Sequence, residues 1–284
     1  MAAFAELVRA PAALTVIGDT AVGAAASGPL LHRSRLLFPL ASVALYWAGM
    51  ALNDWADREL DATERPERPI PSGRVSDRDA LAIAAGLTSA GLALSAAAGG
   101  HRGLRSAVLL TGAICAYDTR LKGTVAGPAG MAMCRMLDVL LGAWPGNLRA
   151  AAPAAAALGV HTLGVTALAA GEVHGGSRAG ASGALAGTAL SALLGALGPT
   201  QAPRHRMTAL ACAFWYAATV GRTQFRAALQ PSAARVRAAT VGGIHGMVPL
   251  QAGLLARHGA LRTATVLAAA LPLAQRFARR VSPT

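Results

Sequence analysis

The sequence is poor in charged side chains, which make up 14% of its 284 residues, whereas hydrophobic residues make up 54%. This balance argues against a water-soluble globule. The three cysteines stand in apolar runs without CxxC spacing, so neither a disulfide framework nor a zinc site is indicated. The net charge of +13 could suggest a nucleic acid partner, but the arginines mostly lie between the apolar runs and form no single basic block. We therefore expect no nucleic acid binding.

Long apolar runs recur along the whole chain, and several reach the roughly 20 residues that cross a hydrocarbon core of about 30 Å. They are rich in Ala and Gly, which suits close packing of helices in a membrane. The sequence therefore predicts an all-α polytopic membrane protein, a single domain over residues 1–284, with nine or ten spanning helices. No cleavage site of a secretory signal follows the first run, so we expect that run to remain as the first span. The predicted spans are residues 11–31, 36–52, 79–99, 104–119, 126–144, 150–170, 180–199, 206–221, 238–255 and 260–277.

One of these spans, 238–255, is predicted to be interrupted or re-entrant, because it contains several glycines and Pro249. Irregular backbone at membrane depth is tolerated only where it is buried in protein or faces a cavity.

Acidic residues are concentrated in one place, since most of the thirteen in the chain fall between Asp54 and Asp79. If the preceding helix continues, Asn53, Asp57 and Asp61 lie on one of its faces, with Asp54 beside them. Carboxylates this close repel one another, and Mg²⁺ bound to phosphate oxygens would relieve the repulsion. The pattern predicts a magnesium diphosphate site. The alternative is a solvated acidic helix end that nearby arginines balance.

The loop after this cluster, residues 65–74, contains three prolines and is predicted to be rigid and extended. Arg65 and Arg68 suit bidentate contact with phosphate oxygens, and Ser72-Gly73 suits a tight turn. The alternative is a surface loop that binds anionic lipid headgroups.

The combined motif Asn53-Asp54-x-x-Asp57-x-x-x-Asp61, followed by Arg65-Pro66-x-Arg68-Pro69-Ile70-Pro71-Ser72-Gly73, resembles the first aspartate-rich motif and adjoining loop of UbiA-type prenyltransferases. The resemblance implies about nine helices around a central cavity. It also implies that a prenyl diphosphate binds through Mg²⁺ and that its prenyl group passes to an acceptor, often aromatic. By this resemblance, the polar residues of the first motif hold Mg²⁺ and diphosphate.

Lys122 is the only lysine in the chain and ends the segment Tyr117-Asp118-Thr119-Arg120-Leu121-Lys122. This segment resembles the Tyr-x-x-x-Leu-Lys stretch found at the corresponding place in the family. We assign Lys122 to the diphosphate. The alternative is a lone cation that anchors a helix at the lipid headgroups.

Arg135 and Asp138 stand one helical turn apart inside the span 126–144. Ionisable residues within a membrane are unfavourable unless they are paired or line a polar cavity. We expect the two to pair with each other and to face the cavity, with Arg135 within reach of phosphate; a purely structural pair is the alternative. Asp19, alone in the first span, is either a cavity residue or a structural one.

The second acidic motif of the family is where the sequence departs, because Glu172 is the one carboxylate where two aspartates are expected. Glu172 with His174 could help to hold a second Mg²⁺, and Arg178 could neutralise phosphate. The segment Glu-Val-His-Gly-Gly-Ser-Arg looks more like the divergent branch that includes EboC-type proteins.

We therefore expect a Mg²⁺-dependent prenyltransferase, a transferase of alkyl or aryl groups other than methyl, which passes a prenyl group to an aromatic or other small acceptor, including lipids. Mg²⁺ would stabilise the diphosphate as a leaving group, and a dry cavity would protect the developing cation. The main alternative is a non-catalytic UbiA-like protein that binds or exports a lipid-linked or aromatic compound. The residues expected to act are Asn53, Asp54, Asp57, Asp61 and Glu172 at the metal, and Arg65, Arg68, Lys122, Arg135 and Arg178, with Asn53, at the diphosphate.

The arginines also predict an orientation in the membrane. If Arg9 is cytoplasmic, the connections on its side carry 13 Arg and Lys residues and the opposite connections carry 9. The positive-inside rule then places the acidic loop on the cytoplasmic side of a multi-pass protein, which we expect in a bacterial cell membrane.

Overall fold

The computed structural model describes residues 2–8, 14–28 and 36–270, and these residues form helices and connecting turns without a strand. The helices are α1 (Ala2–Leu7), α2 (Leu14–Ser27), α3 (Leu37–Ala56), α4 (Arg58–Glu64), α5 (Asp77–Ala116), α6 (Gly127–Gly142), α7 (Leu148–Ala169), α8 (Arg178–Ala196), α9 (Pro203–Leu229) and α10 (Ala233–Arg257). A π-helical turn, Tyr117–Leu121, continues α5. A further apolar helix, Leu261–Ala270, reaches the end of the described part.

Helix α5 consists of two arms, because the backbone at Gly100 leaves the helical conformation (φ 60°, ψ −149°). Only glycine adopts a positive φ without strain. Thr88 and Thr111, about equally far from Gly100 on either side, line the same pocket, so the two arms run side by side in opposite directions. The arms correspond to the predicted spans 79–99 and 104–119. Counting them separately, the described ranges hold nine long helical segments before Leu261.

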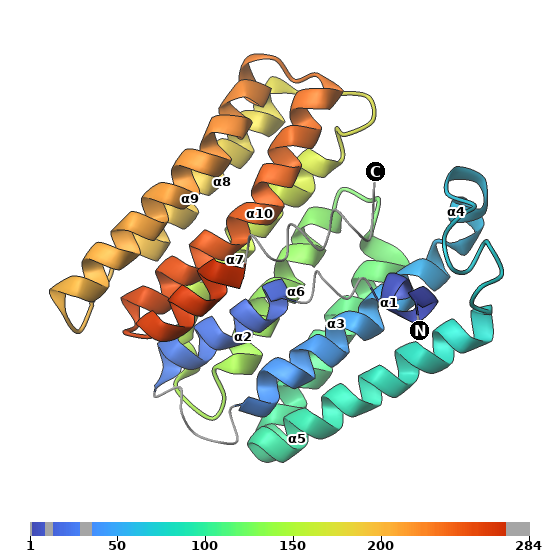
Figure 1. The fold of residues 1–284 in the computed structure, drawn as a ribbon, viewed down its shortest axis with the longest axis horizontal. Coiled ribbons are helices and arrows are strands. Elements are labelled where there is room, and N and C mark those ends of the chain that lie inside the picture. Colours follow the sequence, from blue (N-terminus) through green and yellow to red (C-terminus); the bar gives the residue numbers. More distant parts are fainter. Residues whose placement is uncertain (1, 9–13, 29–35, 271–284) are drawn as a thin grey trace.

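The helices are arranged in two groups (Figure 1). Helices α7, α8, α9 and α10 pack together on one side, and α3, both arms of α5 and α6 pack on the other. Helices α6 and α2 join the groups, because α6 packs against α7 as well as α5, and α2 contacts α3, α6, α7 and α10. Helix α4 and its loop project from the end of α3, at the right of Figure 1, so the acidic cluster lies at one end of the bundle.

Helix α10 runs without interruption from Ala233 to Arg257 and includes Pro249. The prediction of a broken or re-entrant segment at 238–255 was therefore wrong. The glycines serve close packing, since a Cβ at Gly243 would lie 2.4 Å from a methyl of Val165 and one at Gly246 would lie 2.1 Å from a methyl of Val220. Small residues in this helix mark contacts with its neighbours.

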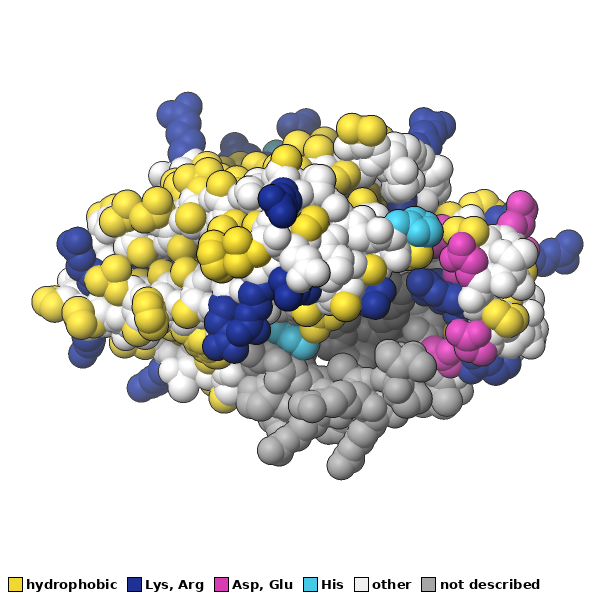
Figure 2. Space-filling view, turned by 90° about the horizontal axis from the view of Figure 1, so that it is seen from above, with side chains coloured by type: hydrophobic (Ala, Val, Ile, Leu, Met, Phe, Trp, Pro, Cys, Tyr) yellow, Lys and Arg dark blue, Asp and Glu magenta, His cyan; other side chains and the backbone are white. Residues whose placement is uncertain are grey.

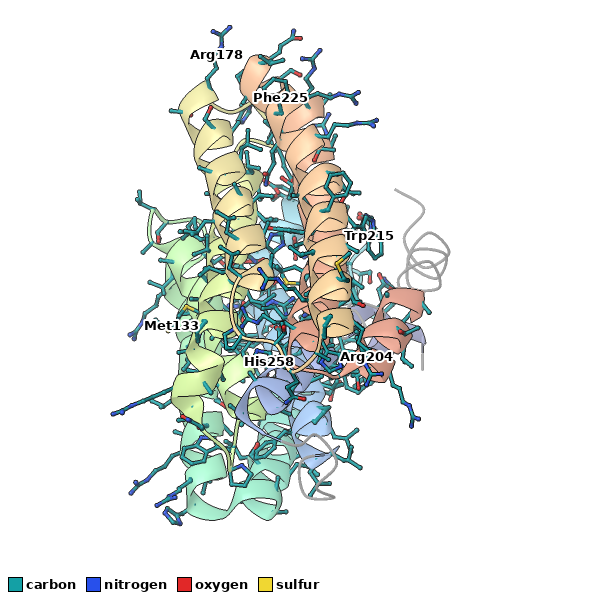
Figure 3. The ribbon with its side chains drawn as sticks, turned by 90° about the vertical axis from the view of Figure 1, so that its left-hand side faces the viewer. Met133, Arg178, Arg204, Trp215, Phe225 and His258 are labelled. Carbon is teal, nitrogen blue, oxygen red and sulfur yellow. The ribbon has the colours of Figure 1, made fainter. Side chains whose placement is uncertain are left out.

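Three helical stretches are long and apolar enough to span a membrane by length and composition alone: Asp77–Leu121, Leu148–Ala169 and Arg178–Ala196. Helix α9 adds an argument from its surface. Large apolar side chains are exposed on this helix, Phe214 among them, and Figure 3 shows two others, Trp215 and Phe225. No charged residue lies between Arg206 and Arg222, which are about 24 Å apart along the helix. An exposed apolar band with arginines at both ends is typical of a helix in contact with lipid.

Candidate active site

The acidic cluster lies where α3 ends and α4 begins. Asp57 separates the two helices, but its backbone N–H donates to the carbonyl of Asn53 at 3.0 Å, and the N–H of Asp61 donates to the carbonyl of Asp57 at 2.8 Å. These bonds keep the α-helical spacing across the junction. Asn53, Asp57 and Asp61 therefore share one face, and the predicted continuation of the helix is confirmed, apart from a short break at Asp57.

Two carboxylates of the cluster are buried, since Asp54 is 4% exposed and Asp61 is 3% exposed. Buried carboxylates are strongly unfavourable without a partner. Arg68 supplies it, because its Nη1 lies 2.7 Å from Asp61 Oδ2 and 3.5 Å from Asp54 Oδ1. One guanidinium thus contacts two carboxylates and offsets one of their two charges. The alternative of a fully solvated acidic helix end does not describe these two residues.

A second cation reaches the cluster from the end of α5. The Lys122 ammonium forms an ion pair with Asp57, so Lys122 lies on the face of the acidic loop as predicted. Beside it, Asn53 Nδ2 donates to Asp118 Oδ1 at 3.2 Å. Asp118 is buried and was given no role by the sequence reasoning. The sequence signal that could have identified Asp118 was its position beside Tyr117, in a chain with few acidic residues.

The loop after α4 is built from successive turns. The Ser72 N–H donates to the carbonyl of Arg68 at 3.0 Å, the Gly73 N–H donates to that of Ile70 at 2.9 Å, and Gly73 has a φ of 73°. The turn at Ser72-Gly73 is confirmed, but the extended conformation predicted for 65–74 was wrong. Proline restricts its own φ and the residue before it, and these restrictions are compatible with turns.

The same loop holds the N-terminal helix through Arg74, whose Nη1 lies 2.6 Å from Glu6 Oε2. This hydrogen-bonded pair keeps the pKa of the Glu6 carboxyl below its ordinary value. Arg65, by contrast, is exposed at the end of α4. Figure 2 shows acidic side chains gathered at the end of the molecule that carries α4, with basic side chains beside them.

Glu172 and Arg178 lie on the connection between α7 and α8. The backbone carbonyl of Glu172 accepts a hydrogen bond from Arg237 Nη1 at 2.7 Å, while Arg178 is exposed at the start of α8 (Figure 3). Across residues 2–8, 14–28 and 36–270, no three His, Cys, Asp or Glu side chains come together as a metal site would require. The acidic groups of the first motif are instead held by Arg68 and Lys122.

Arg135 pairs with Asp19 of α2, at 2.7 Å between Nη1 and Oδ2. Asp138 instead accepts a hydrogen bond from Ser42 Oγ of α3 at 2.8 Å. The predicted pair between Arg135 and Asp138 was wrong. Residues three apart share a helix face, but here each finds its partner on a neighbouring helix, which spacing within one helix cannot reveal.

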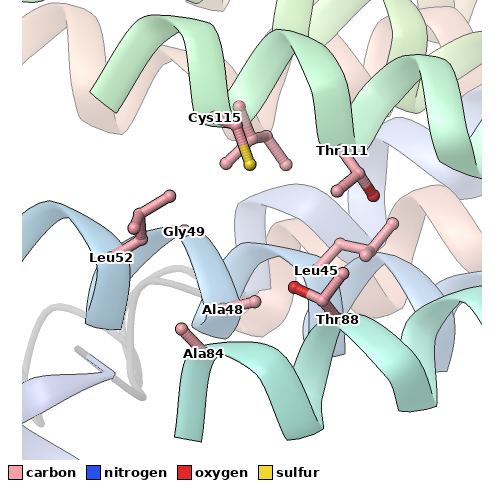
Figure 4. A pocket seen from close by; sticks show the side chains of 9 residues that line it. Leu45, Ala48, Gly49, Leu52, Ala84, Thr88, Thr111 and Cys115 are labelled. Carbon is pink, nitrogen blue, oxygen red and sulfur yellow. The ribbon is translucent and has the colours of Figure 1, made fainter. Parts of the chain in front are cut away.

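A pocket of about 240 Å³, a volume that includes open space at its mouth, lies between α3 and both arms of α5 (Figure 4). Its lining is mostly apolar and contains no charged residue. One wall includes Gly49, where a Cβ would lie 3.5 Å from Asp118 Oδ2, so the pocket borders the Asn53–Asp118 pair.

The first motif supplies oxygen donors of the kind that a hard divalent cation takes, although Arg68 and Lys122 hold its carboxylates in this structure. Its donors are one amide and three carboxylate groups on consecutive helical turns, and oxygen is the ligand that Mg²⁺ prefers. Since a single guanidinium contacts both Asp54 and Asp61, their oxygens already converge around one positive charge.

Comparison with known proteins gives one family. The model of the UbiA prenyltransferase family matches residues 13–233. Digeranylgeranylglyceryl phosphate synthase of Methanopyrus kandleri is 38% identical over 128 residues, which are 44% of this chain and 45% of that protein. The match thus spans less than half the length of this curated relative.

Solved structures share the fold at low sequence identity. The apo structure of a UbiA homolog from Aeropyrum pernix K1 is similar with a TM-score of 0.66 and 17% identity, over 86% of this chain and 96% of that chain. A UbiA homolog from Archaeoglobus fulgidus bound to GPP and Mg²⁺ is similar with a TM-score of 0.64 and 14% identity, over 86% of this chain and 99% of that chain. The predicted all-helical membrane fold is confirmed.

Proposed function

The chain belongs to the UbiA prenyltransferase family, and from this we propose that it transfers a prenyl group from a prenyl diphosphate to a small acceptor within the membrane, with Mg²⁺. One observation carries the proposal: buried Asp54 and Asp61 converge on a single cation at the end of α3. Transport of an apolar compound would not require such a concentration of buried carboxylates. The Archaeoglobus homolog, bound to GPP and Mg²⁺, supports the same chemistry.

Asn53, Asp54, Asp57 and Asp61 would hold Mg²⁺ through their oxygens. When bound, the ion would neutralise charge on the leaving diphosphate. This chain's own cations would share that task, because Arg68 already lies among these groups. A guanidinium presents parallel N–H donors that match phosphate oxygens.

The other predicted phosphate ligands differ in how the structure supports them. Lys122 is placed at the motif by its pair with Asp57, and Arg65 and Arg178 are exposed and free to turn toward an anion. Arg135 would have to leave Asp19, which favours a different role for it. Glu172 remains our proposed ligand for a second Mg²⁺.

The test is transfer of radiolabelled geranyl, farnesyl and geranylgeranyl diphosphate into extracted membrane lipid, with Mg²⁺ or with EDTA. We expect a labelled product only with Mg²⁺. Asp54→Asn and Asp61→Asn should each lower the rate by at least about 100-fold, because each removes a carboxylate that would hold the Mg²⁺, and the Mg²⁺ would stabilise the leaving group. The matched control is Glu59→Gln, an exposed acid of α4 whose carboxylate pairs with Arg58, which should keep near-normal activity.

The variant Glu172→Gln measures whether one carboxylate replaces the second motif, and a loss comparable to that of Asp54→Asn would establish it. Product that persists in EDTA would overturn the metal-dependent mechanism. Retained binding of prenyl diphosphate without any product would favour the alternative of a non-catalytic binding or export protein. The loss of the second aspartate pair, where Glu172 is the one carboxylate, is the observation that keeps this alternative open.

A further inference from the structure

Helix α1 lies against the loop that carries Arg68, a proposed ligand of the diphosphate. Leu7 and Val8 are almost fully buried there, at 0% and 1% exposed. Leu7 belongs to one apolar cluster with Ala51 of α3 and Ile70 of the loop. Apolar contact therefore seats α1 against both the helix and the loop that supply the first motif.

Arg74 joins α1 to this loop by a bidentate ion pair. Its Nη1 lies 2.6 Å from Glu6 Oε2, and its Nη2 donates to Glu6 Oε1 at 3.1 Å. The two side chains are 42% and 41% exposed, and an ion pair this exposed contributes little to stability. Two parallel bonds between a guanidinium and a carboxylate do fix the direction of both groups, so the pair serves geometry more than stability.

Arg74 also holds the backbone of Arg68. Its Nη2 donates to the carbonyl of Glu67 at 2.5 Å, and this carbonyl belongs to the peptide unit that precedes Arg68. Arg74 Nε donates to Ser72 Oγ at 2.9 Å, and the Ser72 hydroxyl in turn donates to the carbonyl of Arg68 at 2.6 Å. The peptide units on both sides of the Arg68 Cα are thus tied to Arg74, and through it to Glu6.

Arg68 is the side chain that these bonds place. Its guanidinium lies 2.7 Å from Asp61 and 3.5 Å from Asp54. An arginine side chain has many rotamers, so its charged end is directed at one site only if its backbone is held. A contact of 3.5 Å is already at the limit of a hydrogen bond, so even a small shift of the loop would break the contact with Asp54.

We propose that Glu6 and Arg74 are positioning residues that hold Arg68 in the orientation that binds the diphosphate, so that helix α1 sets the affinity for the prenyl diphosphate. This inference rests on the proposed function and adds to it two residues outside the acidic motif. Glu6 does not touch the diphosphate in this scheme, because a carboxylate repels that group. Direct binding by Arg74 is a different scheme, which Glu6 would oppose by occupying the guanidinium.

The experiment measures binding, so that it does not depend on turnover. Purified protein in detergent is titrated with a prenyl thiolodiphosphate, an unreactive analogue of prenyl diphosphate, in the presence of Mg²⁺. Glu6→Ala and Arg74→Ala should each raise the Kd about fivefold, because Arg68 is then free to leave the site. The matched control is Arg78→Ala, at an exposed arginine of α5, which should leave the Kd unchanged. A Glu6→Ala protein that binds the analogue as tightly as wild type, or more tightly, would overturn the proposal and favour direct binding by Arg74.

A double-mutant cycle shows whether Glu6 acts through Arg68. In an Arg68→Gln protein nothing is left to position, so Glu6→Ala should change the Kd there by less than about twofold. An equal loss of affinity in both backgrounds would indicate a general loss of structure and would refute the positioning role.

Amide hydrogen exchange decides if Arg68→Gln does not fold. Residues 65–74 should exchange at least about threefold faster in Glu6→Ala than in wild type, whereas α9 should not change. Unchanged exchange in the loop would overturn the proposal. Prenyl transfer by the wild type separates this proposal from the proposed function. A wild type that binds the analogue but transfers no prenyl group would overturn the proposed function and leave the positioning role standing, whereas a wild type that does neither would overturn both.

Discussion

Arg68 connects two buried carboxylates through one guanidinium, so its loss should affect stability as well as chemistry. Removing one partner of a buried ion pair leaves an uncompensated charge and typically destabilises a protein by several kcal/mol. We expect Arg68→Ala to lower the free energy of unfolding by about 3 kcal/mol. The shift in Tm is measured by thermal unfolding in detergent, with size-exclusion chromatography as the readout of the folded fraction.

The neighbouring loop arginine supplies the control for this measurement. Arg65 is exposed, and Arg65→Ala should change Tm very little. Equal Tm values for the two variants would show that Arg68 does not stabilise the motif.

At the scale of residues, the sequence was informative about which polar side chains share a helix face and less so about their partners. The oxygen donors of the first motif could be predicted, because the spacing of Asn53, Asp57 and Asp61 fixes a helix face. The partners of Arg135 and Asn53 could not, since Asp19 and Asp118 approach from other helices. Pairing across helices depends on their rotation and depth, which local spacing does not contain.

At the scale of elements, the contact between α2 and α6 is the tightest constraint on the buried pair of Asp19 and Arg135. A Cβ at Gly23 would lie 1.8 Å from the carbonyl oxygen of Val139, and one at Gly142 would lie 2.5 Å from the Cα of Thr20. The two backbones therefore touch, as small residues in membrane helices allow. This contact sets the separation at which Asp19 meets Arg135.

Gly142→Ala should accordingly force α2 and α6 apart. Overpacking of a close contact typically costs about 1–3 kcal/mol, and here the obstructing atoms belong to the backbone, which cannot rotate away. We expect a lower Tm. Gly86→Ala in α5 is the control, because a Cβ there meets nothing within 4 Å and should stabilise the helix slightly. A Gly142→Ala protein as stable as wild type would contradict the close contact.

Most helices could be predicted from the apolar runs, and their bounds agree with the structure to within several residues. The errors have a common physical origin. Glycine and proline were taken to break α10 at 238–255 and to extend the loop at 65–74, but in a packed bundle glycine also permits close approach, and proline also permits turns. Local propensity cannot distinguish these uses, because the neighbouring helix decides between them.

At the scale of the whole molecule, the open question is which side of the membrane holds the acidic loop. The excess of arginines on its side predicts the cytoplasm. With Cys115, Cys134 and Cys212 replaced by serine, Ser72→Cys in the loop should react with an impermeant maleimide only in inside-out vesicles. Gln201→Cys, in the connection between α8 and α9, should react only from outside in intact cells. The reverse pattern would invert the topology.

The prediction of one domain over residues 1–284 stays a prediction, as does the affinity with the EboC-type branch. The membrane family, by contrast, could be recognised from the sequence, because the first motif and its loop combine residues that few other sites require together. The predicted first span begins at Pro11, and residues 9–13 lie outside the described part. Residues 271–284 also lie outside it, and the last predicted span, 260–277, ends among them.

The pairing of Arg68 and Lys122 with the motif has a thermodynamic consequence for the whole enzyme. Arg68 and Lys122 already offset two of the three carboxylate charges, so a divalent ion that arrives alone must compete with two resident cations. A metal that arrives together with diphosphate faces no such competition, because the displaced guanidinium and ammonium gain phosphate oxygens as new partners. Binding of the metal and binding of the diphosphate are then mutually reinforcing, by the same factor in both directions. Without diphosphate, the motif would hold Mg²⁺ weakly.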